Sequence, residues 1–133
     1  MTFCLDTNIC IYYLKGLYPI LLKKMMEKSP HDINIPSIVK AELFYGAEKS
    51  NKQNATYEKI YEFLIPFEII PFVDKATLFH AKIKSSLTKK GTPIGPNDLL
   101  IAAITMSIDA VLVTNNISAF NRVNGLRLEN WTE

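Results

Sequence analysis

Residues 2–8 read Thr2-Phe3-Cys4-Leu5-Asp6-Thr7-Asn8, and this opening does most to decide the fold class. The apolar run from Phe3 to Leu5 is short and does not alternate with polar residues. A second run of this kind extends from Ala110 to Val113, near the other end of the chain. Continuous apolar runs are typical of parallel strands that are covered by helices on both faces. The two runs therefore predict the central strands of a parallel sheet.

Between these runs, strand-like and helix-like segments alternate. Further strands are predicted at Ile33–Ile35 and Glu68–Phe72, and a final edge strand at Leu126–Trp131. Helices are predicted over residues 8–15, 19–29, 37–49, 52–64, 74–89 and 97–108. This order predicts an α/β fold, a three-layer α/β/α sandwich with a central, mainly parallel sheet and right-handed crossovers. The 133 residues contain no repeat or linker, so we expect one domain, 1–133.

Composition excludes several classes of protein. The chain is 48% hydrophobic and 21% charged, and it has no apolar run near the length of a membrane span. The opening lacks the features of a secretory signal, so we expect a cytoplasmic protein. Cys4 and Cys10 have no companions at zinc-ligand spacing and are interpreted as buried free thiols. The net charge is only +2, which is too small to hold nucleic acid by overall charge. Any nucleic acid would therefore have to bind a local patch of positively charged side chains.

Asp6 occupies the place where a parallel sheet usually binds ligands. It ends the first predicted strand, and ligands of such sheets bind beyond the carboxyl ends of the strands. A metal-ligand role is open for this carboxylate. A helix N-cap is the structural alternative, because Asp is also favoured there.

Glu42 lies inside a predicted helix, on a largely apolar face. Its neighbours on the helix surface include Ile38, Val39, Tyr45 and Gly46. A buried carboxylate needs a compensating charge, which an ion pair with a lysine or a bound cation would supply. We expect Gly46 to leave open space beside this carboxylate.

Asp98 is a lone charge at the start of an apolar helix. Pro96 suits the first turn of a helix, and the residues after Asp98 are apolar on nearly every face. Interaction with the helix dipole is one explanation for an acid at this position. A metal site is the other.

Taken together, the three carboxylates predict a site for a hard cation. Oxygen ligands favour Mg²⁺ or Mn²⁺, whereas zinc would require His or Cys. Such a metal ion activates water and neutralises phosphate charge, which favours phosphodiester hydrolysis. The chain has no Gly-rich phosphate loop and no nucleophile elbow, and His31 and His80 have no partners at ligand spacing.

Four blocks of the sequence resemble PIN-domain endoribonucleases, and within them the VapC-like toxins of type II toxin–antitoxin modules. The blocks are Leu5-Asp6-Thr7-Asn8, Ala41-Glu42-Leu43-Phe44-Tyr45-Gly46-Ala47, Gly91-Thr92-Pro93-Ile94-Gly95-Pro96-Asn97-Asp98-Leu99-Leu100-Ile101-Ala102-Ala103 and Leu112-Val113-Thr114-Asn115-Asn116. By this resemblance Asp6, Glu42 and Asp98 match the acidic metal-site residues. Asn116 stands where many members have an Asp, which removes one negative charge, and Thr114 is expected to support the site by hydrogen bonding.

The resemblance also implies partners. A Mg²⁺-dependent or Mn²⁺-dependent endoribonuclease of this kind cleaves structured RNA such as tRNA, forms a homodimer and is inhibited by a cognate antitoxin, which alone would bring it to operator DNA. The sequence predicts a patch of lysines as the RNA-binding surface, although a solvated helix face explains these lysines equally well. The patch comprises Lys82, Lys84, Lys89 and Lys90, joined by Lys49 and Lys52. For a protein partner it nominates apolar residues that core packing would explain equally well, namely Tyr12, Tyr13, Leu14 and Leu17.

Three other functions remain to be separated from this one. A metal-dependent DNase or flap-type nuclease would use the same acidic residues, and a catalytically silent RNA-binding domain would bind without cleaving. A phosphatase with an aspartyl nucleophile at Asp6 is disfavoured, because the second Asp it requires is replaced by Asn8.

Overall fold

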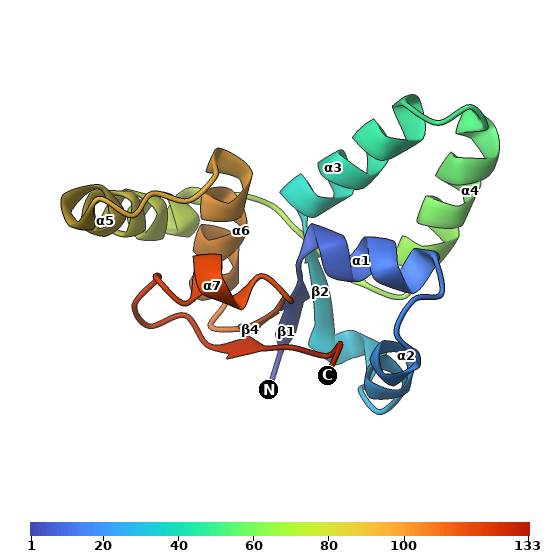
Figure 1. The fold of residues 1–133 in the computed structure, drawn as a ribbon, viewed down its shortest axis with the longest axis horizontal. Helices are drawn as coiled ribbons and strands as arrows, with labels where there is room; N and C mark the ends of the chain where they lie inside the picture. Colours follow the sequence, from blue (N-terminus) through green and yellow to red (C-terminus); the bar gives the residue numbers. More distant parts are fainter.

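The computed structural model describes all residues from 1 to 133 and contains one five-stranded sheet (Figure 1). The strands are β1 Phe3–Leu5, β2 Ile33–Pro36, β3 Glu68–Ile70, β4 Val111–Val113 and β5 Leu128–Glu129. They lie in the order β3-β2-β1-β4-β5, and every neighbouring pair is parallel. The predicted parallel sheet is therefore confirmed, with the first strand at its centre.

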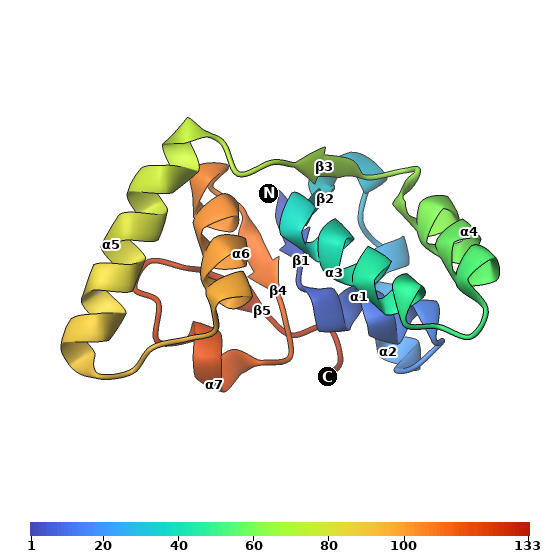
Figure 2. The same cartoon turned by 90° about the horizontal axis from the view of Figure 1, so that it is seen from above.

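Helices connect the strands and cover the sheet. They are α1 Thr7–Leu14, α2 Pro19–Met26, α3 Ser37–Glu48, α4 Gln53–Leu64, α5 Asp74–Lys90, α6 Pro96–Ser107 and α7 Ile117–Phe120. In both Figure 1 and Figure 2, α5 lies to the left of the strands and α4 lies to the right. This arrangement agrees with the predicted α/β/α fold, and none of the helices is long and apolar enough to cross a membrane.

Two predicted strands are shorter in the structure than in the sequence prediction. The strand expected at Glu68–Phe72 ends at Ile70, because Pro71 follows and has no N–H to donate to a neighbouring strand. The strand expected at Leu126–Trp131 keeps only Leu128–Glu129, because its partner β4 ends at Val113, opposite Glu129. The sequence prediction also missed two short helical turns, α7 and the 3-10 helix at Pro30–Asp32.

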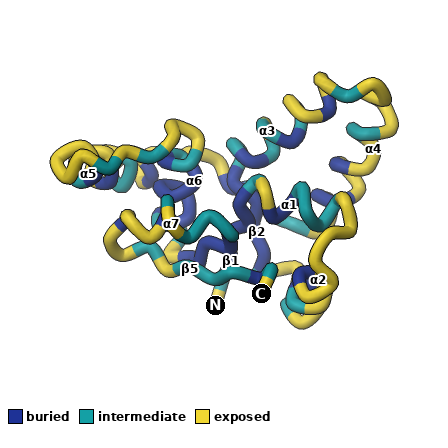
Figure 3. Tube along the Cα trace, viewed as in Figure 1, coloured by how far each residue is buried: buried dark blue, intermediate teal, exposed yellow.

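The core lies between the sheet and its helices. All three residues of β1 and all three of β4 are buried, as expected for central strands, and Figure 3 shows burial concentrated on the strands and on α6. The expected interior position of α6 is confirmed by its seven buried residues. Cys4 and Cys10 are free and buried, and burial raises the pKa of both thiols.

The register of the central strands determines where the polar residues that follow them lie. Leu5 pairs with Val113, so the next residues of both strands, Asp6 and Thr114, meet at one edge of the sheet. Helices α1 and α3 begin directly after β1 and β2 at this same edge. The carboxyl ends of the strands and the first turns of these helices thus form one surface, as expected for a ligand site in a parallel sheet.

Candidate active site

Asp6 is almost completely buried where β1 ends, with 4% of its surface exposed. Its Oδ1 accepts a hydrogen bond from the Thr7 N–H at 2.7 Å, and it is the N-cap residue of α1. Its Oδ2 accepts a hydrogen bond from the Thr114 hydroxyl at 2.8 Å. The capping role considered as an alternative is therefore present, but it occupies only one of the two carboxylate oxygens.

Glu42 is half-buried on α3 and its Oε1 accepts a 2.6 Å hydrogen bond from the Thr7 hydroxyl. Thr7 thus connects two of the predicted site residues, since its N–H binds Asp6 and its hydroxyl binds Glu42. The expected alternative, an ion pair between Glu42 and a lysine, is wrong, because the only ion pair in the structure joins Arg127 and Asp109. Glu42 is left without a cationic partner.

Gly46 does not lie beside the Glu42 carboxylate as expected. It lines a separate hollow between α1, α3 and α4, together with Leu14, Leu43 and Ile60. Gly46 follows Glu42 by four residues, which turns its position on the helix by about 40° relative to Glu42, toward the buried face of α3. The prediction that Gly46 leaves open space beside the Glu42 carboxylate is therefore wrong.

Asp98 lies in the first turn of α6, which packs against α3. It is half-buried, and a side chain at Gly95 would come within 3.8 Å of its Oδ2. Burial is the main cause that raises the pKa of the Asp98 carboxyl, and the negative charge of Glu42 adds to it. Asp98 therefore lies within electrostatic range of Glu42.

The three carboxylates repel one another across a shared space. Burial raises the pKa of Asp6 from 3.8 to about 6, and the charges of Asp98 and Glu42 add to this effect, while hydrogen bonds from Thr114 and Thr7 oppose it. No three acidic, histidine or cysteine side chains approach closely enough in the structure to hold one ion together. None of the three carboxylates has an ion-pair partner in the structure. A donor set of unpaired carboxylates fits a hard divalent cation such as Mg²⁺ or Mn²⁺.

Thr114 and Asn116 complete this edge of the sheet. The Thr114 hydroxyl donates to Asp6 and accepts a hydrogen bond from the Asn116 backbone N–H at 2.9 Å. Asn116 is the N-cap residue of α7, but its side chain makes no capping hydrogen bond. Its amide group is therefore not committed to holding the helix.

Comparison with known proteins agrees with this architecture. Residues 3–126 match the PIN domain family. The chain belongs to the PIN domain family. It is 43% identical to ribonuclease VapC2 of Rickettsia felis and 35% identical to the tRNA(fMet)-specific endonuclease VapC of Salmonella typhimurium, with 98% of each chain covered in both cases. The solved VapBC2 complex of Rickettsia felis, bound to a promoter DNA fragment, superposes with a TM-score of 0.93 at 41% identity, covering 98% of this chain and 99% of the other. The resemblance to VapC-like proteins is thus confirmed.

Thr7 is the residue of this PIN domain site that the sequence prediction missed. A hydroxyl next to a helix-capping residue carries no distinctive signal in the sequence. The position of Thr7 could have indicated its role, because the side chain of a Thr at the start of a helix is free to contact a residue on another helix or strand. In the structure that residue is Glu42, 35 positions further along the chain.

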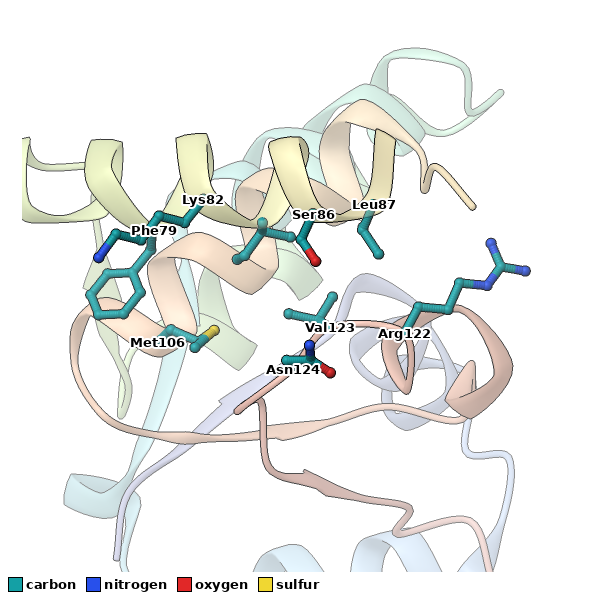
Figure 4. A pocket seen from close by; sticks show the side chains of 9 residues that line it. Phe79, Lys82, Ser86, Leu87, Met106, Arg122, Val123 and Asn124 are labelled. Carbon is teal, nitrogen blue, oxygen red and sulfur yellow. The ribbon is translucent and has the colours of Figure 1, made fainter. Parts of the chain in front are cut away.

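Several hollows of this PIN domain have no carboxylate in their lining. One of about 290 Å³ lies between α5, α6 and residues 122–124, and its lining is mainly apolar, with Phe79, Met106 and Val123 among its residues (Figure 4). The charged ends of Lys82 and Arg122 point away from it, and Arg122 donates to the Pro93 carbonyl. No carboxylate lines it, so it is not part of the acidic site.

The predicted lysine patch is divided between two parts of the PIN domain. Lys82, Lys84, Lys89 and Lys90 are exposed on α5, whereas Lys49 and Lys52 lie at the far end of α3, on the opposite side of the strands (Figure 2). The expectation that these lysines join one patch is wrong. His31 lies in the exposed turn before β2, and His80 packs against Phe72, so neither histidine belongs to the site.

Proposed function

We propose that this chain is a Mg²⁺-dependent endoribonuclease that acts as the toxin of a toxin–antitoxin pair. The observation that carries the proposal is a set of three carboxylates, on Asp6, Glu42 and Asp98, that share one edge of a VapC-like sheet and have no cationic partner. The whole chain, 1–133, is the nuclease domain in this proposal. The VapC ribonucleases, which align over nearly their full length, support the assignment of RNA as the substrate.

The chain's own residues divide the work of the site. Asp6 is held rigidly by Thr7 and Thr114, and Glu42 is oriented by the Thr7 hydroxyl. Asp98 lies in the first turn of α6, where the helix dipole attracts negative charge and opposes the effects of burial and of Glu42, which raise its pKa. When Mg²⁺ or Mn²⁺ is bound by these carboxylates, it supplies an activated water and offsets negative charge on the attacked phosphate.

Asn116 has a lesser part in this proposal. Its amide is available to orient the attacking water or to offer its oxygen to the metal ion, and Thr114 fixes the position of its backbone. As a neutral residue it adds no charge, so the site holds one cation tightly and a second only weakly in the absence of RNA.

The proposed partners follow from the relatives. A structured RNA such as tRNA is the proposed substrate, because one relative is named a tRNA(fMet)-specific endonuclease. We propose a homodimer and a cognate antitoxin that covers the acidic residues and alone carries the complex to operator DNA. The support is that VapBC complexes of Rickettsia felis and Salmonella typhimurium have been solved bound to DNA. We propose a cytoplasmic location for this pair.

The apolar surface nominated for a protein partner is only partly available. Leu17 is exposed and, with Tyr13, lines a hollow of about 390 Å³ between α1 and α2. Tyr12 is committed elsewhere, because its hydroxyl accepts a hydrogen bond from the Asn115 amide at 3.0 Å. The proposed antitoxin contact therefore centres on Leu17 and Tyr13.

The test is cleavage of a purified tRNA with Mg²⁺ and with a chelator, by wild-type protein and by Asp98→Asn. Asp74→Asn is the matched control, because Asp74 is also an acid in the first turn of a helix but is exposed on α5, away from the site. We expect Mg²⁺-dependent cleavage by wild type and by Asp74→Asn, and its loss in Asp98→Asn. Cleavage of DNA without RNA would favour the DNase alternative, and RNA binding without cleavage would favour a silent binding domain. Full activity in Asp98→Asn would refute the assignment.

A further inference from the structure

Tyr45 is an exposed aromatic residue on the same face of α3 as Glu42. It is 64% exposed, and it lies three residues after Glu42, a spacing that places two side chains on neighbouring positions of a helix surface. Lys49 follows four residues later, with its Nζ 4.5 Å from the centre of the Tyr45 ring. Glu42, Tyr45 and Lys49 form one line along α3, which we call the α3 stripe.

Packing does not explain the exposure of the Tyr45 ring. The buried residues of α3 are Val39, Leu43 and Ala47, on the other side of the helix. The neighbouring aromatic residues Phe44, Tyr57 and Tyr61 pack against one another, and Tyr45 is not among them. The ring is therefore a large exposed aromatic surface with the Lys49 ammonium group beside it.

The stripe leads away from the carboxylates. Helix α3 runs from the edge of the sheet outward to its connection with α4 (Figure 1), and exposed residues follow one another toward its far end (Figure 3). At 1.5 Å per residue, Tyr45 lies about 4.5 Å and Lys49 about 10 Å beyond Glu42 along the helix axis. Each nucleotide of one strand advances by about 3.4 Å along the axis of a duplex and by more when the strand is extended, so the stripe has room for about two nucleotides of an extended strand.

We propose that the α3 stripe binds single-stranded RNA next to the scissile phosphate, with a base stacked on Tyr45 and a phosphate in contact with Lys49. The inference rests on the proposed ribonuclease function and adds a binding surface to it. Aromatic rings combined with positive side chains bind unpaired bases without requiring a particular sequence. A cation outside the acidic cluster also attracts the RNA backbone that the carboxylates repel.

The experiment measures RNA affinity separately from cleavage. The probe is a fluorescein-labelled oligoadenylate of about ten nucleotides, bound in a chelator so that it stays intact, with fluorescence anisotropy as the readout. We expect Tyr45→Ala to weaken binding by about tenfold and Tyr45→Phe to change it less than about twofold, because phenylalanine keeps the ring. Lys49→Gln should reduce the slope of log affinity against log salt by about 0.7, the value for one phosphate contact on a single strand. Alanine is the best helix former, so the Tyr45→Ala protein keeps α3.

Tyr61→Ala is the matched control, because Tyr61 is 54% exposed but lies on α4, off the stripe. Its RNA affinity should equal that of wild type. Equal affinity in Tyr45→Ala and wild type would overturn the inference, even if wild type cleaves RNA. Weaker binding accompanied by smaller sedimenting species would assign Tyr45 to a contact between copies of the chain and would also overturn it. Absence of both binding and cleavage in wild type would instead refute the proposed function.

Steady-state cleavage gives a second readout. With Mg²⁺ present, Tyr45→Ala should raise KM for the same RNA and leave kcat within about threefold of wild type, because stacking on a neighbouring base binds substrate and transition state alike. Glu42→Gln should instead lower kcat. A fall in kcat with unchanged KM in Tyr45→Ala would contradict the stacking role.

Discussion

Replacing Asp6 by asparagine should stabilise the metal-free protein at neutral pH while abolishing its activity. The carboxyl of Asp6 has a pKa of about 6 in the folded protein, raised mainly by burial, against 3.8 for an ordinary aspartate. The folded state therefore holds this proton more strongly than the unfolded chain does. Stability from this group is fully present below about pH 4 and is lost as the pH rises through about 6.

The size of the effect follows from the shift. A difference of about two pH units corresponds to about 3 kcal/mol of unfolding free energy lost between pH 4 and pH 8. Asparagine is neutral at every pH and has nearly the same shape. Its oxygen can keep the bond from the Thr7 N–H, and its amide can donate to the Thr114 hydroxyl oxygen. One rearranged hydrogen bond costs about 1 kcal/mol, so we expect a net gain of about 2 kcal/mol at pH 8.

The assay is urea unfolding of both proteins in a chelator, at about pH 4 and about pH 8. Asp6→Asn should be the more stable protein at the higher pH, and the difference should shrink or reverse at the lower pH. Asp74→Asn serves as the control, because Asp74 is exposed on α5, away from the site, and this variant should not gain stability at pH 8. The reasoning would be refuted if Asp6→Asn were less stable than wild type at pH 8, or if the difference in unfolding free energy between the two proteins did not change with pH. Either result would show that burial of the Asp6 charge does not destabilise the fold.

Three further expectations concern single residues. Thr7→Val should lower kcat by about tenfold, because it removes the hydrogen bond that orients the Glu42 carboxylate. Thr7→Ser should keep kcat near the wild-type value, because serine retains the hydroxyl. Asn116→Asp should strengthen binding of a second Mn²⁺ in calorimetric titration of the RNA-free protein, and Asn116→Ala should reduce cleavage less than Asp98→Asn; two ions of similar affinity in wild type would contradict this. Trp131→Ala should cost about 3 to 5 kcal/mol in urea unfolding, because the ring is 1% exposed and its centre lies 5.1 Å from that of Phe3.

The sheet could be predicted from sequence because its signals are local. Continuous apolar runs mark β1 and β4, and a Pro in a first turn marks the start of α6. The last strand was overestimated because its length depends on its partner, since β5 pairs only with the two final residues of β4. Side-chain periodicity contains no information about how long a neighbouring strand will be.

The places of the candidate site residues in their helices and strands could be predicted from the sequence, but their mutual arrangement could not. Asp6 and Asp98 follow from their positions at element starts, and the structure places both where the pattern indicates. Glu42 was expected to be buried with Gly46 beside it, yet it is half-buried and its contact is Thr7. That contact depends on how α1 and α3 pack, and packing between distant segments leaves no trace in the spacing of residues within either one.

The hydrogen bond between Thr114 and Asp6 joins residues 108 positions apart. During synthesis, the first strand leaves the ribosome long before the β4 segment that becomes its neighbour has been made, and domains form as chains emerge from the N-terminus at about 5 to 20 residues per second. A nascent chain therefore contains Asp6 without the hydroxyl that fixes it, and β1 has no partner on one side. The acidic edge of the sheet is therefore completed only after the β4 segment has been made and has paired with β1.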